Sequence, residues 1–206
     1  MSDIQLNFIN ESNDRNNSNV VIFQKNVATT FEEVAVAWKV IQNCGQGFHH
    51  PFSYPMTMDV AVSDSMGNYS PKKPAQNGEL FTFSLNQSGD SLQRTGAAAG
   101  ANEIDVLNGL ELGAINVSVY KAGKVLAIKT AVAPKQKAVF EFLPSIFIGV
   151  VSQVQEGEVM NSAVLSNINT QISLLGIASA DIVMTGGGPG PTSSAFQFAL
   201  ENVKYA

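Results

Sequence analysis

The chain has 206 residues, of which 45% are hydrophobic and only 14% are charged, and its formal net charge is −5. This length suits one well-buried core, so we expect a single domain that spans residues 1–206. The acidic balance provides no basic field for phosphate backbones, which argues against nucleic-acid binding. Charged residues usually make up about 25% of a soluble domain, so a largely neutral polar surface that tolerates contact with another polar surface is predicted here.

The first ten residues, MSDIQLNFIN, contain no basic segment followed by an apolar one, so no secretory signal is predicted. The longest apolar runs are too short to cross a bilayer as helices, and we expect no transmembrane segment. A single cysteine, Cys44, cannot form a disulfide within the chain, which agrees with a reducing compartment. We therefore expect a cytoplasmic protein, or one exported by a route without a classical signal peptide.

Alternation of apolar and polar residues with a period of two dominates the chain and predicts half-buried strands. In chain order the alternating segments are residues 4–8, 56–62, 81–85 and 115–119. The last of these runs into YKAGK, where Gly123 can supply the positive φ of a hairpin turn before Val125. Further strands are predicted at residues 138–142, 146–151, 168–175, 181–184 and 196–202.

The segment TTFEEVAVAWKVIQ, which begins at residue 29, has both helical and strand features. Thr30 and Glu33 match a capping box, which is typical of a helix start. Apolar residues at every second position from Val34 to Val40, several of them β-branched, favour a strand instead. We expect a helical turn at residues 31–33 followed by a strand over residues 34–41.

Clusters of Gly, Asn, Pro and Ser separate the predicted strands and are typical of turns. NESNDRNNSN (residues 10–19) is predicted to be a solvated hairpin tip. GGGPGP (residues 186–191) lacks the ending of a phosphate-binding loop and is interpreted as a connection between strands. Many short strands with such spacing predict an all-β fold, an antiparallel β-sandwich of Greek-key or jelly-roll type with at most a short helical turn.

The segment NCGQGFHHP (residues 43–51) gathers Cys44, His49 and His50, the residue types that bind metals or act as nucleophiles. They are weak metal candidates, because adjacent extended residues point to opposite sides and no CxxC or HxxxH partner is present. We expect no catalytic residue, metal or cofactor here. The segment is interpreted as a glycine-hinged loop in which Cys44 is buried. Phe48, His49 and His50 are then candidates for a subunit or ligand contact that protonation near pH 6 could modulate.

The last third of the chain has unusually little charge, since no basic residue occurs between Lys137 and Lys204. Exposed sheet edges usually carry charge, especially Lys, which keeps chains from pairing. Within this region the polar residues Asn167, Asn169 and Gln171 alternate with apolar ones. Three interpretations remain open: burial inside one subunit, contact with a neighbouring subunit, or rearrangement into a membrane pore.

The leading hypothesis is a non-enzymatic protein that acts through its surface and self-associates into a homo-oligomer or an ordered structural assembly, with Asn167, Asn169 and Gln171 among the contacts. The alternative is a lectin-like or other ligand-binding module, in which the polar loops at residues 10–19 and 87–94 bind a glycan. A pore-forming or enzymatic protein is the third hypothesis.

Overall fold

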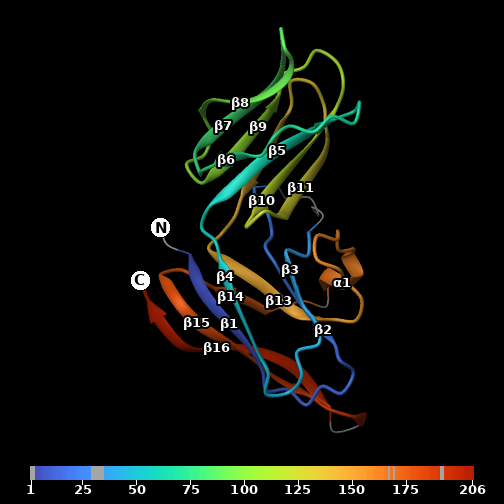
Figure 1. Cartoon of the computed structure of the whole chain (residues 1–206), viewed down its shortest axis with the longest axis vertical. Coiled ribbons are helices and arrows are strands. Elements are labelled where there is room, and N and C mark those ends of the chain that lie inside the picture. The colour runs from blue at the N-terminus through green and yellow to red at the C-terminus, as the bar shows by residue number, and fades with distance from the viewer. Residues whose placement is uncertain (1–2, 29–34, 167, 169, 191–192) are drawn as a thin grey trace. The chain divides into compact units, whose positions relative to one another are not determined.

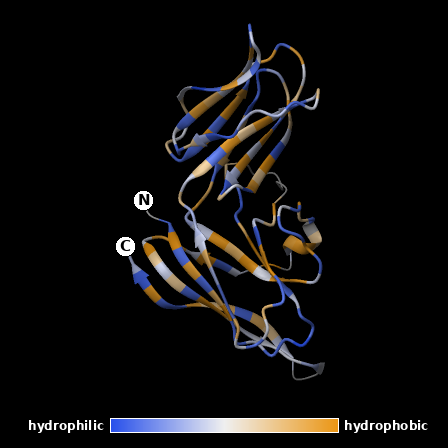
Figure 2. Ribbon diagram, viewed as in Figure 1, coloured by the Kyte–Doolittle hydropathy of each residue, from blue (hydrophilic) through white to orange (hydrophobic). Residues whose placement is uncertain are grey.

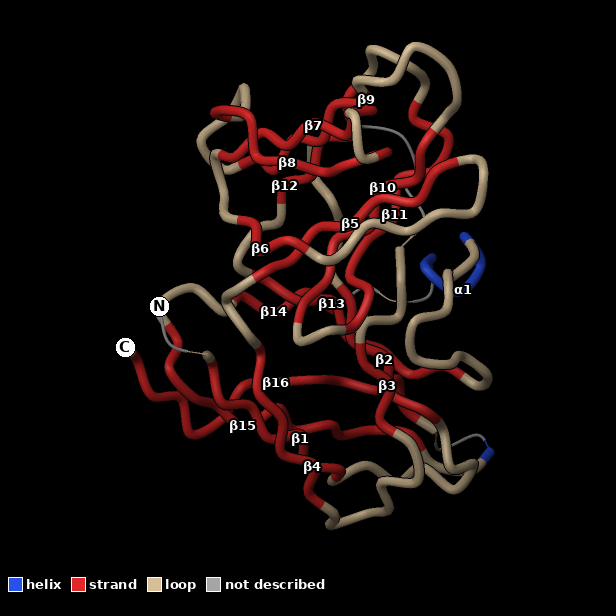
Figure 3. Tube along the Cα trace, turned by 45° about the horizontal axis from the view of Figure 1, so that its top comes forward, coloured by secondary structure: helices blue, strands red, loops and turns tan. Residues whose placement is uncertain are grey.

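The computed structural model describes residues 3–28, 35–166, 168, 170–190 and 193–206 (Figure 1). In these residues strands dominate the trace, and α1 (Ser162–Ser166) is the one α-helix (Figure 3). The strands form four four-stranded sheets, and in the described part of the chain none of the sheets closes on itself. The prediction of an all-β fold is therefore confirmed. The helical turn predicted at residues 31–33 lies outside the described residues.

The strands are β1 (Ile4–Asn10), β2 (Asn19–Phe23), β3 (Lys39–Ile41), β4 (His49–Tyr54), β5 (Met58–Asp64), β6 (Lys73–Ala75), β7 (Glu79–Asn86), β8 (Gly89–Ala97), β9 (Glu103–Asn108), β10 (Ile115–Lys121), β11 (Lys124–Val132), β12 (Lys137–Glu141), β13 (Ser145–Val151), β14 (Thr170–Ser173), β15 (Ile177–Gly187) and β16 (Ser194–Tyr205).

The chain divides into two compact units. Unit 1 comprises Met1–Gln24, Val36–Met56 and Pro144–Ala206, and unit 2 comprises Lys25–Ala35 and Thr57–Leu143. The two segments of unit 2 thus alternate along the sequence with the three segments of unit 1. The expectation of one domain over residues 1–206 stays a prediction, because it depends on whether the two units fold and unfold together.

Unit 1 contains two sheets, with the strand orders β16-β15-β1-β4 and β14-β13-β2-β3. In the first sheet β1 is central, pairing in parallel with β15 and antiparallel with β4. Ile4, Leu6 and Phe8 are buried, while Gln5 and Asn7 point to the other, more polar face. The alternation predicted for residues 4–8 is confirmed, and it is visible along the strands in Figure 2.

The core of unit 1 includes several packed aromatic rings. Trp38 and Tyr54 meet edge to face with 5.6 Å between ring centroids, and Phe23 stacks on Phe147 at 5.4 Å. The strand predicted over residues 34–41 is shorter than expected, since only β3 is regular. Residues 35–38 are all buried, so the alternating apolar pattern does not correspond to one covered and one exposed face.

Unit 2 contains the sheets β11-β10-β5-β6 and β12-β9-β7-β8, and β7 and β9 pair in parallel. The predicted hairpin joins β10 to β11 and is confirmed: Ala122 and Gly123 have φ values of 52° and 75°, as a tight turn with two left-handed residues requires. The predicted alternation in β7 fails at Leu85, which is 70% exposed and pairs with Asp90 close to the turn into β8.

The prediction that residues 10–19 form a hairpin tip is wrong, because β1 and β2 belong to different sheets and the segment connects them. Its polar side chains satisfy the backbone of the loop itself. Asn10 Oδ1 accepts a hydrogen bond from the Ser12 amide at 2.9 Å, and Asp14 Oδ2 accepts one from the Ser18 amide at 2.8 Å. The same turn chemistry therefore supports a connection between sheets as well as a hairpin.

The glycine-rich segment at residues 186–191 begins inside a strand, since Gly186 and Gly187 end β15. The connection to β16 follows, as predicted. A Cβ atom on Gly187 would lie 2.6 Å from Cε1 of Phe196, so the missing side chain makes room for this ring. Among the described residues, no helix has the length and apolar character needed to cross a membrane.

Candidate functional site

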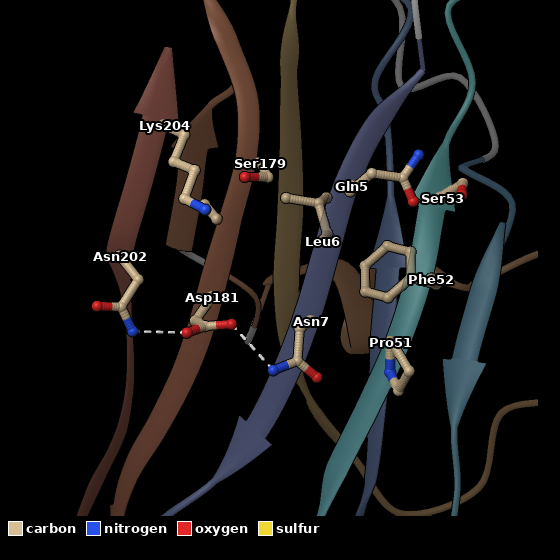
Figure 4. Close-up of a pocket in the computed structure, with 11 residues that line it drawn as sticks. Gln5, Leu6, Asn7, Pro51, Phe52, Ser53, Ser179, Asp181, Asn202 and Lys204 are labelled. Atoms are coloured by element: carbon tan, nitrogen blue, oxygen red, sulfur yellow. Dashed lines mark hydrogen bonds between the residues drawn. The ribbon is translucent and has the colours of Figure 1, made fainter.

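An open cavity of about 460 Å³ lies on the polar face of the sheet β16-β15-β1-β4 in unit 1 (Figure 4). Its polar lining consists of Asp181 surrounded by Gln5, Asn7, Ser53, Ser179, Asn202 and Lys204. All four strands of the sheet contribute to it. The cavity thus presents a carboxylate, amides, hydroxyls and one ammonium group.

Strand register brings these side chains together. Gln5 lies opposite Ser53 on one side and Ser179 on the other, while Asn7 lies opposite Asp181. Ser179 in turn lies opposite Lys204 of β16. Because directly opposed residues in a sheet point to the same face, this register builds two polar rows across the strands.

Asp181 is held by amides from both neighbouring strands. Asn7 Nδ2 donates to Oδ1 at 2.9 Å, and Asn202 Nδ2 donates to Oδ2 at 2.7 Å. The hydrogen bond from Asn202, then that from Asn7, and the charge of His49 lower the pKa of Asp181 below its ordinary value of 3.8, although burial opposes them. Asp181 is therefore an oriented carboxylate at neutral pH.

A bulge in β16 places Asn202 beside Asp181. Asn202 has a φ of 49°, and the pairing of β15 with β16 shifts register between Ser179 and Asp181. Bulges of this kind redirect a side chain at the edge of a sheet. Asn is one of the residues that adopt a left-handed backbone most readily, which suits it to this position.

The loop that contains Cys44 is pinned to the end of β1. Asn10 Nδ2 donates to the Cys44 carbonyl oxygen at 2.6 Å, and the Asn10 amide donates to the Phe48 carbonyl oxygen at 3.1 Å. Cys44 is half-buried, not fully buried as expected, because it lies in this surface loop. Burial still raises the pKa of its thiol, so the reactive thiolate is disfavoured.

His49 and His50 are the first residues of β4, whereas the sequence predicted that they lie in a loop. They pair with Ile9 and Phe8, so their side chains point to opposite faces. Asn7 Nδ2 lies 3.3 Å from His49 Nδ1, which connects His49 to the Asp181 cluster. Among the described residues, no group of three or more His, Cys, Asp or Glu side chains is arranged to hold a metal ion.

The residues predicted to form contacts fall in different parts of unit 1. Phe48 is 64% exposed and immediately precedes β4, whereas the two histidines belong to the cavity-bearing sheet. Gln171 lies in β14 of the other sheet, where its Nε2 donates to Ser145 Oγ at 3.0 Å. Asn167 and Asn169 lie outside the described residues. A contact role for all these residues stays a prediction.

The polar cluster itself was missed by the sequence analysis. Asn7 and Asp181 are separated by 174 positions and meet only because β1 and β15 pair in parallel. The one available signal was the polar half of the alternating pattern in β1, which marks a polar sheet face without revealing which strand lies beside it.

The outer edge of the same sheet is a second candidate surface. β16 has 12 residues and pairs with β15, and no other strand of the described chain pairs with it. Residues 194–200 carry no charge. Phe198 and Leu200 lie opposite the buried Met184 and Ile182 but are themselves only half-buried, as is Phe196.

Comparison with known proteins identifies no relative, since no family model, curated protein or solved structure matches the chain. The geometry of the described residues is therefore the basis for the functional argument.

Proposed function

We propose that this is a non-enzymatic protein that acts by self-association, and that the free edge of β16 is the associating surface. The observation that carries the proposal is that β16 is a long, largely exposed edge strand whose first seven residues, 194–200, carry no charge. An unpaired strand edge offers a row of backbone donors and acceptors to another strand. A second chain can satisfy these groups and cover the apolar side chains beside them.

Few of the features that normally keep an edge strand from pairing with another chain occur in the first part of β16. Natural edges are protected by short strands, proline, bulges or charge. Residues 194–200 contain no proline and no charged residue, and pairing with β15 is regular from Gln197 to Glu201, between register shifts on either side. The uncharged segment therefore remains suited to backbone pairing.

Light scattering coupled to size-exclusion chromatography tests the proposal. The wild-type chain is expected to show a mass that rises with concentration above that of the monomer. A variant with Gln197→Lys and Ala199→Lys should remain monomeric, because added lysines repel a second strand at the edge. A wild-type chain that stays monomeric at every concentration would overturn the proposal.

The arrangement of the strands also supports a proposal about how the sheets pack on each other. We infer that the two sheets of each unit pack face to face as a β-sandwich with Greek-key connections, antiparallel as expected except for the parallel pairs β1–β15 and β7–β9. In unit 1, β16 lies against β13 and β14 of the other sheet. The buried residues of β1 alternate with more exposed ones, as sandwich strands require.

Glycan binding in the cavity is a second candidate function. Sugar hydroxyls both donate and accept hydrogen bonds, and the Asp181 cluster offers both kinds of partner. Asp181 is already oriented by Asn7 and Asn202, so little ordering is needed on binding.

A glycan array followed by calorimetry on any sugar that binds tests this candidate. Asp181→Asn should weaken binding about tenfold, because a charged acceptor is replaced by a neutral amide. Glu11→Gln makes the same change of charge at an exposed position in the connection after β1 and should leave affinity unchanged. An array without any hit, with and without calcium, would overturn the candidate.

A further inference from the structure

We infer that two copies of this chain pair through antiparallel β16 strands, with a two-fold axis at Phe198 that joins the two edges into one continuous eight-stranded sheet. The inference rests on the proposed self-association and adds the partner, the direction and the register. A two-fold arrangement uses the same patch on both copies, so one surface suffices. Each residue then lies opposite the residue of the second copy that is equally far from Phe198 on the other side, so Gln197 lies opposite Ala199.

Charge selects the antiparallel direction. In a parallel in-register pair, Glu201 and Lys204 would each lie beside the same residue of the second copy, and like charges opposite each other are destabilising. In the antiparallel pair about Phe198, Glu201 lies opposite the small neutral Ala195. No like charges then face each other among the paired described residues.

The apolar residues of β16 select the register. Phe196, Phe198 and Leu200 follow one another at every second position and are half-buried, and the last two share the face of buried Ile182 and Met184. An axis at Phe198 places Phe198 opposite its own copy and Phe196 opposite Leu200. An axis one residue earlier or later leaves either Leu200 or Phe196 without an apolar partner.

The bulge marks where the paired segment ends. The left-handed backbone of Asn202 and the register shift beside it interrupt the regular strand after Glu201. Pairing with β15 is regular over Gln197–Glu201, which includes Phe198 and Leu200, and a second register shift lies between Gln197 and Ser194. The neighbouring edge strand β14, with the sequence TQIS, adds no charge that would repel a second copy.

Disulfide trapping in a Cys44→Ser background tests the register. Phe198→Cys should form a covalent homodimer in oxidised glutathione, because directly opposed residues have Cα atoms about 4.5–5.5 Å apart, within the range of a disulfide. Ala195→Cys and Glu201→Cys should crosslink only when the two variants are mixed. Each lies about 20 Å from its own copy across the axis, at about 3.4 Å per residue.

Ser88→Cys, on the exposed turn between β7 and β8, measures crosslinking by random collision. The paired variants should crosslink at least about tenfold faster than this control, because association raises the effective thiol concentration. The mixed pair leaves Phe198 intact, so the test does not depend on a variant that removes the central ring.

The outcomes separate the two proposals. Selective crosslinking of Phe198→Cys and of the mixed pair supports the register. A wild-type dimer in which neither pair crosslinks faster than Ser88→Cys overturns the register and leaves self-association standing. A monomer at all concentrations overturns both.

Discussion

The edge strands of the two units differ in charge. In unit 2, β8 carries Asp90 and Arg94, and β11 carries Lys124 and Lys129. In unit 1, β16 is longer than either and carries its two charges, Glu201 and Lys204, near its end, so residues 194–200 have none. Charge on an edge strand is a common protection against pairing with another chain. The contrast indicates that the edges of unit 2 are protected, whereas one edge of unit 1 is open to a partner.

The opposite edge of the same sheet shows protection of another kind. β4 has six residues and contains Pro51, which has no backbone N–H to offer a partner strand. The difference between β4 and β16 is the reason for placing the proposed association on one side of the sheet.

The largest expected effect comes from placing charge on the open edge. Gln197 and Ala199 lie opposite each other in the proposed pair, so Gln197→Lys with Ala199→Lys brings lysines of the two copies together. We expect the dissociation constant to rise about 1,000-fold, or ~4 kcal/mol, as measured by sedimentation equilibrium. Gln93→Lys with Ala97→Lys on the protected strand β8 is the matched control and should change nothing. If both double variants raised the dissociation constant equally, the contrast between the open edge of β16 and the protected edge of β8 would be refuted.

Removing an ion pair of unit 2 should destabilise that unit without weakening association. Lys137 Nζ lies 2.6 Å from Oδ2 of Asp105, whose side chain is fully buried and whose Oδ1 has no hydrogen-bond partner among the described residues. Lys137→Ala leaves the carboxylate without its counter-ion and should cost about 3 kcal/mol of unfolding free energy, at the low end for buried pairs because Lys137 is 39% exposed.

The control for this variant is Lys135→Ala, which removes an ion pair with the exposed Glu111 and should leave the urea unfolding midpoint almost unchanged. Loss of association in Lys137→Ala, under conditions where unit 2 remains folded, would contradict the assignment of the partner surface to unit 1.

The ring of Phe196 provides a smaller test of the open edge. Gly187 has a φ of 74° and faces this ring, so Gly187→Ala adds backbone strain and a clash, about 2 kcal/mol together. Gly190→Ala adds strain at a φ of 62° with no atom within 4 Å and should cost about 1 kcal/mol. Association should weaken in Gly187→Ala alone, and an equal loss in both variants would argue against a role for the ring.

The smallest expected effect is the pH dependence that Asp181 gives to unit 1. Its folded-state pKa is lowered mainly by the hydrogen bond from Asn202, so its ionised form is stabilising at pH values above the ordinary pKa of 3.8. This contribution should disappear as pH falls through the lowered folded-state pKa. The difference in unfolding free energy between wild type and Asp181→Asn, measured by urea titration, should shrink over that range. If this difference did not change with pH, ionisation of Asp181 would not contribute to the stability of unit 1.

Local features of this fold could be predicted from the sequence, and pairings between distant segments could not. The β10–β11 hairpin was predictable because the alternation and Gly123 lie within one short segment. Residues 10–19 were assigned to a hairpin in error, because Asn, Asp and Ser favour turns whether the next strand lies in the same sheet or in another one. The Asp181 cluster depends on a parallel pair across 174 positions, which no local pattern encodes.

The edge position of β16 could not be predicted for a similar reason. Its strand was expected at residues 196–202, but alternation does not reveal strand order. The low charge of the last third of the chain was visible in the sequence. It became relevant to the proposed association when the structure placed the uncharged residues 194–200 on an edge strand.

Sedimentation equilibrium of the wild-type chain over a concentration series up to about 1 mM tests the central claim most directly. If β16 edges pair, the series shows a reversible transition from the 21.9 kDa monomer to a species of twice that mass. A single species at the monomer mass across the whole series would contradict it.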